Sequence, residues 1–193
     1  MTGLQELWAQ DAARDDMLVL VDGLDRPLGV ASKLEAHQRG LLHRAFSVVL
    51  VREGTQGLEL LLASRAEGKY HSAGLWANSC CSHPRAGEEL LEAAERRVGE
   101  ELGCGVRDLR EVGSFVYRAV FSSGLSEHEY DHVLLGRPVG EPEPDPAEVG
   151  GLRWERLDDV AHELAEHPEH FAAWAPMVLS IALRHLVDEG LAA

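Results

Sequence analysis

The chain has 193 residues, and 45% of them are hydrophobic, which is enough to build one sizeable core in a single domain. Its 18 basic and 33 acidic residues give a formal net charge of −15 at pH 7. This charge argues against a general nucleic-acid-binding protein and against a protein drawn to anionic membranes. An anionic substrate would need local Lys, Arg or metal ions to overcome the field of the whole chain.

The start of the chain and the cysteines indicate a cytoplasmic protein. Residues 1–16 lack the basic start and apolar centre of a secretory signal, and no run of about 18 apolar residues predicts a membrane span. We interpret residues 1–16 as a mobile or weakly helical leader and residues 17–193 as one domain. Cys80, Cys81 and Cys104 do not resemble a disulfide framework, so at least one is a free thiol.

The pattern of apolar residues predicts several strands, one central helix and terminal helices. Strands rich in β-branched residues are expected at residues 17–22, 28–32, 45–52, 58–64, 109–119, 129–137 and 151–157. A central helix is expected between Gly87 and Gly103, and further helices at residues 158–166 and 168–188. Polar or proline-rich links are expected at residues 33–43, 120–127 and 139–147. This order predicts an α/β sandwich in which helices cover a mixed sheet.

Residues 78–103 join two cysteines and a histidine to the central helix. Apolar side chains recur every four residues along this helix and predict one buried face, at Leu90, Ala94, Val98 and Leu102. Arg97 and Glu101 lie one turn apart, and Gly103 stands where a helix commonly ends. A thiol, an imidazole and a helix with acidic and basic side chains therefore come together here.

Histidines and carboxylates are candidates for a metal site. His37, His43 and His83 lie in separate parts of the chain, whereas Glu127 and Glu129 are two residues apart and would face the same side of a strand. Three imidazoles and two carboxylates can bind a divalent transition metal or a hard cation. Since the chain has ten histidines, spacing alone favours the alternative that these are ordinary surface or buried histidines.

Cys81 is a second candidate, because a thiol beside a metal-bound His83 can have a lowered pKa and exchange protons with a substrate. The alternative is a small buried apolar side chain, which is the usual role of a lone cysteine. Cys80 offers a comparison, because on a strand its side chain faces the opposite side from that of Cys81. Only one of the two can lie in a given pocket.

Cationic side chains form a third group in this acidic chain. They are Lys33, Arg65, Lys69, Arg96 and Arg97. Together they would suit a diphosphate, which Arg can bind through two hydrogen bonds, whereas solvated surface charge is the alternative for each one alone. Glu101 could hold a Mg²⁺ ion on phosphate oxygens, or it could form an ion pair with Arg97.

Five separate motifs occur in one order along the chain: Trp76, residues 78–84 (NSCCSHP), residues 100–103 (EELG), residues 117–118 (YR) and residues 127–129 (EHE). Together they resemble type I isopentenyl diphosphate isomerase, a member of the Nudix fold superfamily. The similarity extends from about residue 33 to residue 137. It implies a Nudix-like α/β/α sandwich with a mixed sheet, and a single catalytic domain at residues 17–193.

The resemblance implies that isopentenyl and dimethylallyl diphosphate are interconverted by protonation and deprotonation at carbon. It implies catalytic roles for Cys81 and Glu129 on opposite faces of the substrate, with Tyr117 assisting the carboxylate. The implied ligands of a divalent metal, which could be Mg²⁺, Mn²⁺ or Zn²⁺, are His37, His43, His83, Glu127 and Glu129. Glu101 would help to hold a Mg²⁺ ion on the diphosphate, and the cations around it would be Lys33, Arg65, Lys69 and Arg97.

Aromatic walls would protect and stabilise a carbocation, and Trp76 and Trp174 are the candidates. In the family, a Trp within a Phe-x-Pro-Trp-like segment closes the pocket, whereas here Trp174 precedes the proline. The expected partner is a small isoprenoid diphosphate, with neither nucleic acid nor membrane, and we favour a monomer.

Two other functions compete with this hypothesis. A Nudix hydrolase of nucleoside diphosphate derivatives would carry Arg-Glu-x-x-Glu-Glu-x-Gly on the central helix, but Arg97 replaces the first acid of that signature. Losing one magnesium carboxylate and gaining a cation weakens this interpretation. A zinc-stabilised binding module would need a closed set of paired ligands, which two adjacent cysteines and one nearby histidine do not form.

Overall fold

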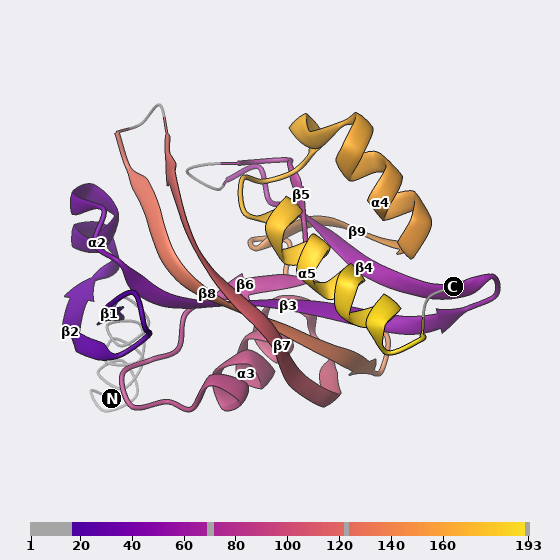
Figure 1. Cartoon of the computed structure of the whole chain (residues 1–193), viewed down its shortest axis with the longest axis horizontal. Helices are drawn as coiled ribbons and strands as arrows, with labels where there is room; N and C mark the ends of the chain where they lie inside the picture. Colours follow the sequence, from indigo (N-terminus) through magenta and orange to yellow (C-terminus); the bar gives the residue numbers. More distant parts are fainter. Residues whose placement is uncertain (1–16, 69–71, 122–123, 192–193) are drawn as a thin grey trace, which may run out of the picture.

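A computed structural model describes residues 17–68, 72–121 and 124–191. The strands are β1 (Met17–Val21), β2 (Pro27–Ser32), β3 (His43–Gly54), β4 (Gly57–Arg65), β5 (Trp76–Ala77), β6 (Cys80–Ser82), β7 (Gly105–Val120), β8 (Ser126–Val139) and β9 (Val149–Arg156) (Figure 1). The helices are α2 (Lys33–Arg39), α3 (Leu90–Leu102), α4 (Leu157–Glu166) and α5 (Ala175–Asp188), with a 3-10 turn, η1 (Pro168–His170). The predictions made for residues 1–16 and for Lys69 fall outside the described residues.

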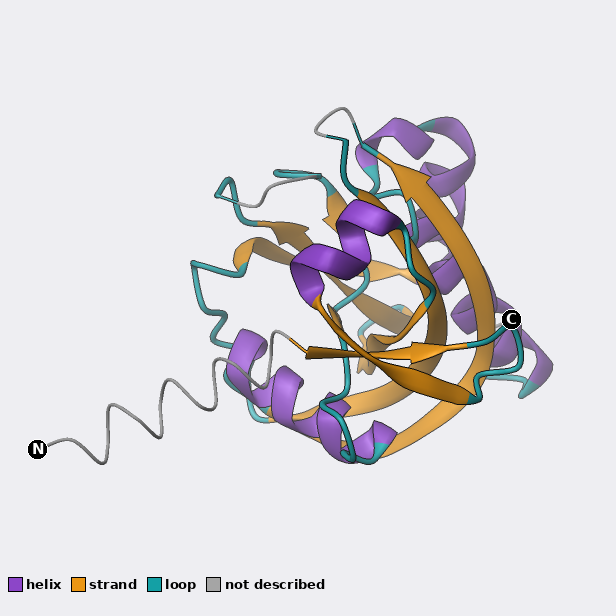
Figure 2. Cartoon of the chain, turned by 90° about the vertical axis from the view of Figure 1, so that its left-hand side faces the viewer, coloured by secondary structure: helices purple, strands orange, loops and turns teal. Residues whose placement is uncertain are grey.

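The sheet is mixed and is built around β3. This strand pairs in parallel with β8 and antiparallel with β1, β4 and β6. The long strands β7 and β8 form an antiparallel hairpin, and β9 pairs antiparallel with β4. Figure 2 shows the resulting curvature of the strands, with helices packed on both sides. The predicted mixed sheet is therefore confirmed.

Alternating side chains of the central strands supply two apolar cores, one on each face of the sheet. On β3, Val49 and Val51 face one core, which includes Val178 and Leu179 of α5. Side chains of the opposite parity, including those of Val48 and Leu50, pack with α3 in the other core. Helices therefore cover both faces, as an α/β/α sandwich requires. Among the described residues, no helix is long and apolar enough to span a membrane.

The helix α3 follows the apolar repeat read from the sequence. Ala94, Val98 and Leu102 are fully buried, and Leu90 packs at the edge of the same core. The helix ends at Gly103, which has a left-handed φ of 63° and donates its backbone N–H to the Gly99 carbonyl. This C-cap fixes the end of the helix that carries Arg97 and Glu101.

Several expected boundaries were wrong. Residues 33–39 form the helix α2 rather than a polar link, with Ser32 as its N-cap and Gly40 as its left-handed C-cap. A seven-residue helix is too short to show a clear apolar repeat. Glu127 lies on β8 rather than in a loop, and the final helix begins at Ala175, after η1 and a non-helical segment.

Candidate active site

The register of the strands brings the candidate residues together. In the parallel pair, His43 on β3 lies opposite Glu129 on β8. Tyr117 on β7 lies opposite the same glutamate, from the other side. On the remaining edge of β3, Ser47 lies opposite Cys81 on β6. Strands that are far apart in the sequence therefore converge at one end of the sheet.

The predicted metal ligands form a compact group. Potential ligand atoms of His37, His43, His83 and Glu129 all lie within 4.8 Å of one another, so these side chains could hold a metal ion. Glu129 Oε1 is 3.0 Å from His83 Nε2 and 3.5 Å from His43 Nε2. Glu127 lies beside this group, with its Oε2 4.0 Å from His37 Nε2. All five residues predicted as ligands are thus brought together.

Two of the three imidazoles, those of His37 and His83, favour the neutral form that binds a metal ion. Burial lowers the pKa of His37 to about 4, and burial together with Lys33 lowers the pKa of His83 well below its usual value. For His43, burial acts in the same direction, but the neighbouring Glu129 outweighs it and raises the pKa. His43 Nδ1 is 2.8 Å from the Leu41 carbonyl, so this nitrogen donates and Nε2 is left to face the cluster.

Glu129 is anchored as an anion. Burial acts to raise its pKa, but hydrogen bonds with Glu127 and His43 outweigh burial and lower the pKa to about 2. The Tyr117 hydroxyl donates a 2.7 Å hydrogen bond to Glu129 Oε2, the oxygen that does not contact the histidines. Burial raises the pKa of Tyr117 well above its usual value, so the phenol keeps this proton.

Cys81 is held by three polar groups. It donates to Asn78 Oδ1 at 3.1 Å, accepts from Trp174 Nε1 at 3.1 Å, and lies 3.5 Å from Ser47 Oγ. Burial, with the charge of Asp131, raises the pKa of Cys81 to about 12, and the lowered pKa expected beside a metal-bound His83 stays a prediction for the metal-loaded site. The sulfur is therefore a protonated thiol in this structure.

Cys80 faces away from Cys81, as strand alternation predicts. Cys80 is 2% exposed and packs in the core that α3 covers, whereas Cys81 lies at the edge of the core that α5 covers. The two thiols are thus on opposite faces of β6. Cys81, on the face that α5 covers, accepts a hydrogen bond from Trp174 Nε1.

Cys81 and Glu129 line one cavity of about 130 Å³. Tyr117 and Trp174 also line it, together with the cations Lys33, Arg65 and Arg97. Since these cations come from α2, β4 and α3, three separate elements place positive charge around one space. The cavity thus joins a carboxylate, a thiol and a wall of cationic side chains.

Glu101 lines the same cavity, and its carboxylate forms an ion pair with Arg97. The ion pair considered as an alternative from the sequence is therefore present, although on a buried side chain rather than on the helix surface. Arg96, by contrast, pairs with Glu88 at 2.7 Å and does not line the cavity among the described residues. Arg96 is thus half-buried in ion pairs with Glu88 and Glu100 rather than placed as a solvated surface charge.

The two predicted aromatic walls are placed differently. Trp174 is 4% exposed and lines the cavity, with the Arg65 guanidinium 5.2 Å from the centre of its ring. Trp76 instead stacks against Arg153 at 4.2 Å, and it is absent from the cavity wall formed by the described residues. Trp174 therefore keeps the position predicted for it, although it precedes the proline.

Three polar residues near the thiol, Ser47, Asn78 and Asp131, were not predicted from the sequence as members of this site. Asn78 and Ser47 contact the thiol, and Ser47 also donates to Asp131 at 2.8 Å. Asp131 could have been found, because strand alternation places it on the same face as Glu127 and Glu129. Ser47 gives no such signal, since it contacts the thiol only through the pairing of β3 with β6.

Comparison with known proteins connects this geometry to a family. A family model of the NUDIX domain matches residues 41–175. The chain is 48% identical over 177 residues to an isopentenyl-diphosphate Delta-isomerase from Photobacterium profundum, covering 91% of this chain and 98% of that protein. It is 47% identical over 160 residues to the enzyme of the same name from Serratia proteamaculans, covering 83% and 87% of the two chains.

Solved structures agree on the fold. A Deinococcus radiodurans protein matches with a TM-score of 0.64 at 18% identity, covering 86% of this chain and 97% of its own. A MutT Nudix hydrolase from Burkholderia pseudomallei matches with a TM-score of 0.57 at 22% identity, covering 72% and 96%. Such low identities show the fold alone, whereas identities near one half over most of both chains show the family. The chain therefore belongs to the isopentenyl-diphosphate Delta-isomerase family of NUDIX-domain proteins.

Proposed function

We propose that this protein interconverts isopentenyl diphosphate and dimethylallyl diphosphate by moving protons at carbon. The observation that carries this proposal is that Cys81 and Glu129 line one cavity, with Glu129 bonded to Tyr117 and grouped with three histidines. The relatives with this name cover the chain almost completely, which supports the same reaction here. A Nudix hydrolase is not favoured, because Arg97 stands where its signature has an acid.

The reaction needs a strong local acid and little water. An unactivated alkene is a very weak base, and protonating its terminal carbon forms a tertiary cation that water would trap. One group adds a proton to the terminal carbon, and the group on the other face removes a proton from the carbon nearer the diphosphate. Cys81 and Glu129, assisted by Tyr117, are the proposed pair. The indole face of Trp174 would stabilise the cation between them.

A divalent metal ion fits the group formed by His37, His43, His83, Glu127 and Glu129. The donor set, three imidazoles and two carboxylates, suits a transition metal or Mg²⁺. A bound cation would fix the Glu129 carboxylate and make a proton on or near it more acidic. Mg²⁺, Mn²⁺ and Zn²⁺ stay open as candidates for this site.

The diphosphate would lie against Lys33, Arg65 and Arg97, which supply positive charge within an acidic chain. Lys69 belongs to the same predicted group but lies outside the described residues. Glu101, which lines the same cavity, would help to hold a Mg²⁺ ion that neutralises the charge of the diphosphate. A monomer in the cytoplasm stays a prediction.

Incubation with isopentenyl diphosphate and Mg²⁺ in deuterated water tests this function. We expect dimethylallyl diphosphate that has gained deuterium at a methyl carbon, detected by mass spectrometry and NMR. Release of phosphate without any isomer would instead support hydrolysis. Turnover of a nucleoside diphosphate derivative, with no exchange into the C5 diphosphate, would contradict the proposal.

A further inference from the structure

The turn between α4 and α5 carries a second group of metal-binding side chains. His167, Glu169 and His170 offer ligand atoms that all lie within 4.8 Å of one another. The side chains of His167 and His170 are 56% and 48% exposed, so an ion in solvent can reach them. Within the described part of the chain, the wall of the substrate cavity includes none of the three. This cluster is therefore separate from the site proposed above.

The backbone of this turn places the two imidazoles side by side. Residues 168–170 form the 3-10 turn η1, and the His170 N–H donates to the His167 carbonyl at 3.0 Å. In 3-10 geometry, side chains three residues apart lie nearly above one another. The rings of His167 and His170 accordingly stack, with centroids 4.9 Å apart and an angle of 14° between planes. Pro168 stiffens the turn at its first position.

The ligand atoms have nearly the spacing that a small ion requires. Glu169 Oε1 lies 3.3 Å from His167 Nδ1 and 4.0 Å from His170 Nε2. In a tetrahedral site with bonds of about 2.0 to 2.1 Å, neighbouring ligand atoms are about 3.4 Å apart. Because the two rings are nearly parallel, their in-plane lone pairs do not converge as they stand, and both exposed imidazoles would have to turn about χ2 out of this stack to meet one ion. Three protein ligands would leave a fourth position open to water.

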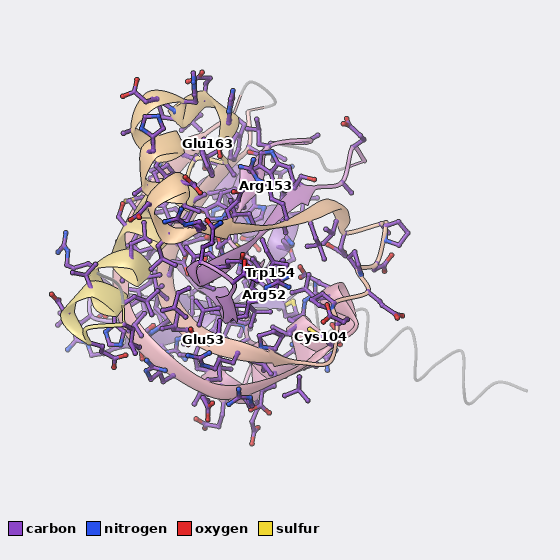
Figure 3. The ribbon with its side chains drawn as sticks, turned by 90° about the vertical axis from the view of Figure 1, so that its right-hand side faces the viewer. Arg52, Glu53, Cys104, Arg153, Trp154 and Glu163 are labelled. Atoms are coloured by element: carbon purple, nitrogen blue, oxygen red, sulfur yellow. The ribbon has the colours of Figure 1, made fainter. Side chains whose placement is uncertain are left out.

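A carboxylate behind the cluster orients one of the imidazoles. His170 Nδ1 lies 3.1 Å from Glu163 Oε1 on α4, so this nitrogen donates and Nε2 is left as the acceptor that faces Glu169. Glu163 is held in turn by Arg153 of β9 at 2.5 Å, and Figure 3 shows these two side chains pointing toward one another. A carboxylate that accepts from the second nitrogen is the usual partner of a metal-bound histidine.

We propose that His167 Nδ1, Glu169 and His170 Nε2 bind a divalent transition metal ion of the Zn²⁺ type, with Glu163 as the orienting carboxylate. Imidazole nitrogens favour Zn²⁺, Ni²⁺ or Cu²⁺ over Mg²⁺, so cellular Mg²⁺ would not fill this site. The turn leads directly into the segment that carries Trp174. In this segment the backbone N–H of Ala172 donates to the Trp76 carbonyl at 2.9 Å. A bound ion would therefore stabilise the segment through which Trp174 reaches the wall of the substrate cavity.

Titration of the full chain with Zn²⁺, followed by calorimetry, tests this site. We expect two classes of bound Zn²⁺ in the wild type, one at each histidine cluster, and loss of one class in the double variant His167→Ala/His170→Ala. His162→Ala is the matched control, because it removes an exposed histidine on neighbouring α4 that is outside the cluster found among the described residues. It should keep both classes. Glu163→Gln should weaken the surface class by about tenfold or more.

Equal Zn²⁺ stoichiometry in the wild type and the double variant would overturn the proposal, as would a single class in the wild type that the double variant keeps. Thermal unfolding without metal checks that the variants fold. If the double variant is unstable, the single variant His167→Gln carries the same test. Since Zn²⁺ binding is read without turnover, failure of this site leaves the proposed isomerase activity unaffected.

Discussion

Trp174 Nε1 donates a 3.1 Å hydrogen bond to Cys81 Sγ, although the two residues are 93 positions apart in the chain. The same indole ring also contacts Arg65, whose guanidinium lies 5.2 Å from the centre of the ring. One aromatic side chain thus connects the thiol to the cationic wall of the cavity. Trp174 precedes the proline but still lines the cavity. The turn η1 and the non-helical residues that follow η1 place Trp174 next to Cys81 of β6.

Trp174→Phe keeps an aromatic wall but removes the N–H that contacts Cys81. Since a hydrogen bond of this kind contributes about 1 kcal/mol, we expect kcat to fall by about fivefold to tenfold. Trp174→Leu also removes the aromatic face and should lower kcat further. Steady-state kinetics with isopentenyl diphosphate measures both changes. Wild-type kcat in both variants would exclude a role for this side chain at the reacting carbons.

Cys81→Ala should lower isomerisation by about 10³-fold or more, because it removes one of the two proton-transferring groups. Diphosphate binding should stay measurable, since Lys33, Arg65 and Arg97 are unchanged. Cys80→Ala is the matched control, because its thiol packs under α3 on the other face of β6. Comparable turnover of Cys81→Ala and Cys80→Ala would contradict the assignment.

The variants Glu129→Gln and Tyr117→Phe distinguish the role of the carboxylate from the role of the phenol, which donates a 2.7 Å hydrogen bond to it. Glu129→Gln removes a proton-transferring group and a metal-binding charge, so we expect a loss of about 10³-fold or more. Tyr117→Phe leaves the charge in place and should cost less, about tenfold to 100-fold, as expected for one hydrogen bond to a charged group. If Tyr117→Phe lost more activity than Glu129→Gln, the phenol of Tyr117 rather than the Glu129 carboxyl would be the principal proton donor.

Removal of metal with a chelator should abolish turnover, because an ion held by His37, His43, His83 and Glu129 would position the Glu129 carboxylate. Adding back Mg²⁺, Mn²⁺ or Zn²⁺ separately identifies which ion restores activity. Circular dichroism provides the control, since the two apolar cores do not depend on these side chains and the fold should persist. Unfolding on chelation, with no turnover in the metal-bound form, would instead support a zinc-stabilised module.

Much of the fold could be predicted from local patterns. The apolar repeat of α3 predicted its buried face, and alternation predicted that Cys80 and Cys81 face opposite sides. The helix α2 was missed because seven residues give too little periodicity, although its caps, Ser32 and Gly40, can be seen in the sequence.

The cavity could be predicted only in part, because its membership depends on pairing between distant strands. Spacing placed Glu127 and Glu129 together, but only the parallel register of β3 with β8 puts His43 opposite Glu129. Likewise, no local pattern distinguishes Trp174, which reaches the thiol, from Trp76, which stacks on Arg153. The motifs identified the chemistry, and tertiary packing decided which side chains surround it.

Gly99, within α3, and Gly103, at its C-cap, should respond in opposite ways to substitution by alanine, with opposite changes in the free energy of unfolding. Gly103 has a φ of 63°, and a Cβ at this position would overlap the Glu143 carbonyl, which is fixed by the 2.8 Å hydrogen bond from Glu143 N to Leu102 O. Gly103→Ala should therefore lower the free energy of unfolding by more than about 1 kcal/mol. Urea denaturation measures this change.

Gly99→Ala is the matched variant, four residues earlier on the same helix. A Cβ there meets none of the described atoms within 4 Å, and alanine favours helix more than glycine does. We expect the free energy of unfolding to rise by about 0.5 to 1 kcal/mol. Alanine reduces the conformational entropy of the unfolded chain, so less entropy is lost when the helix forms. Equal stabilities of Gly99→Ala and Gly103→Ala would show that neither the left-handed φ of Gly103 nor its close approach to Glu143 constrains this position.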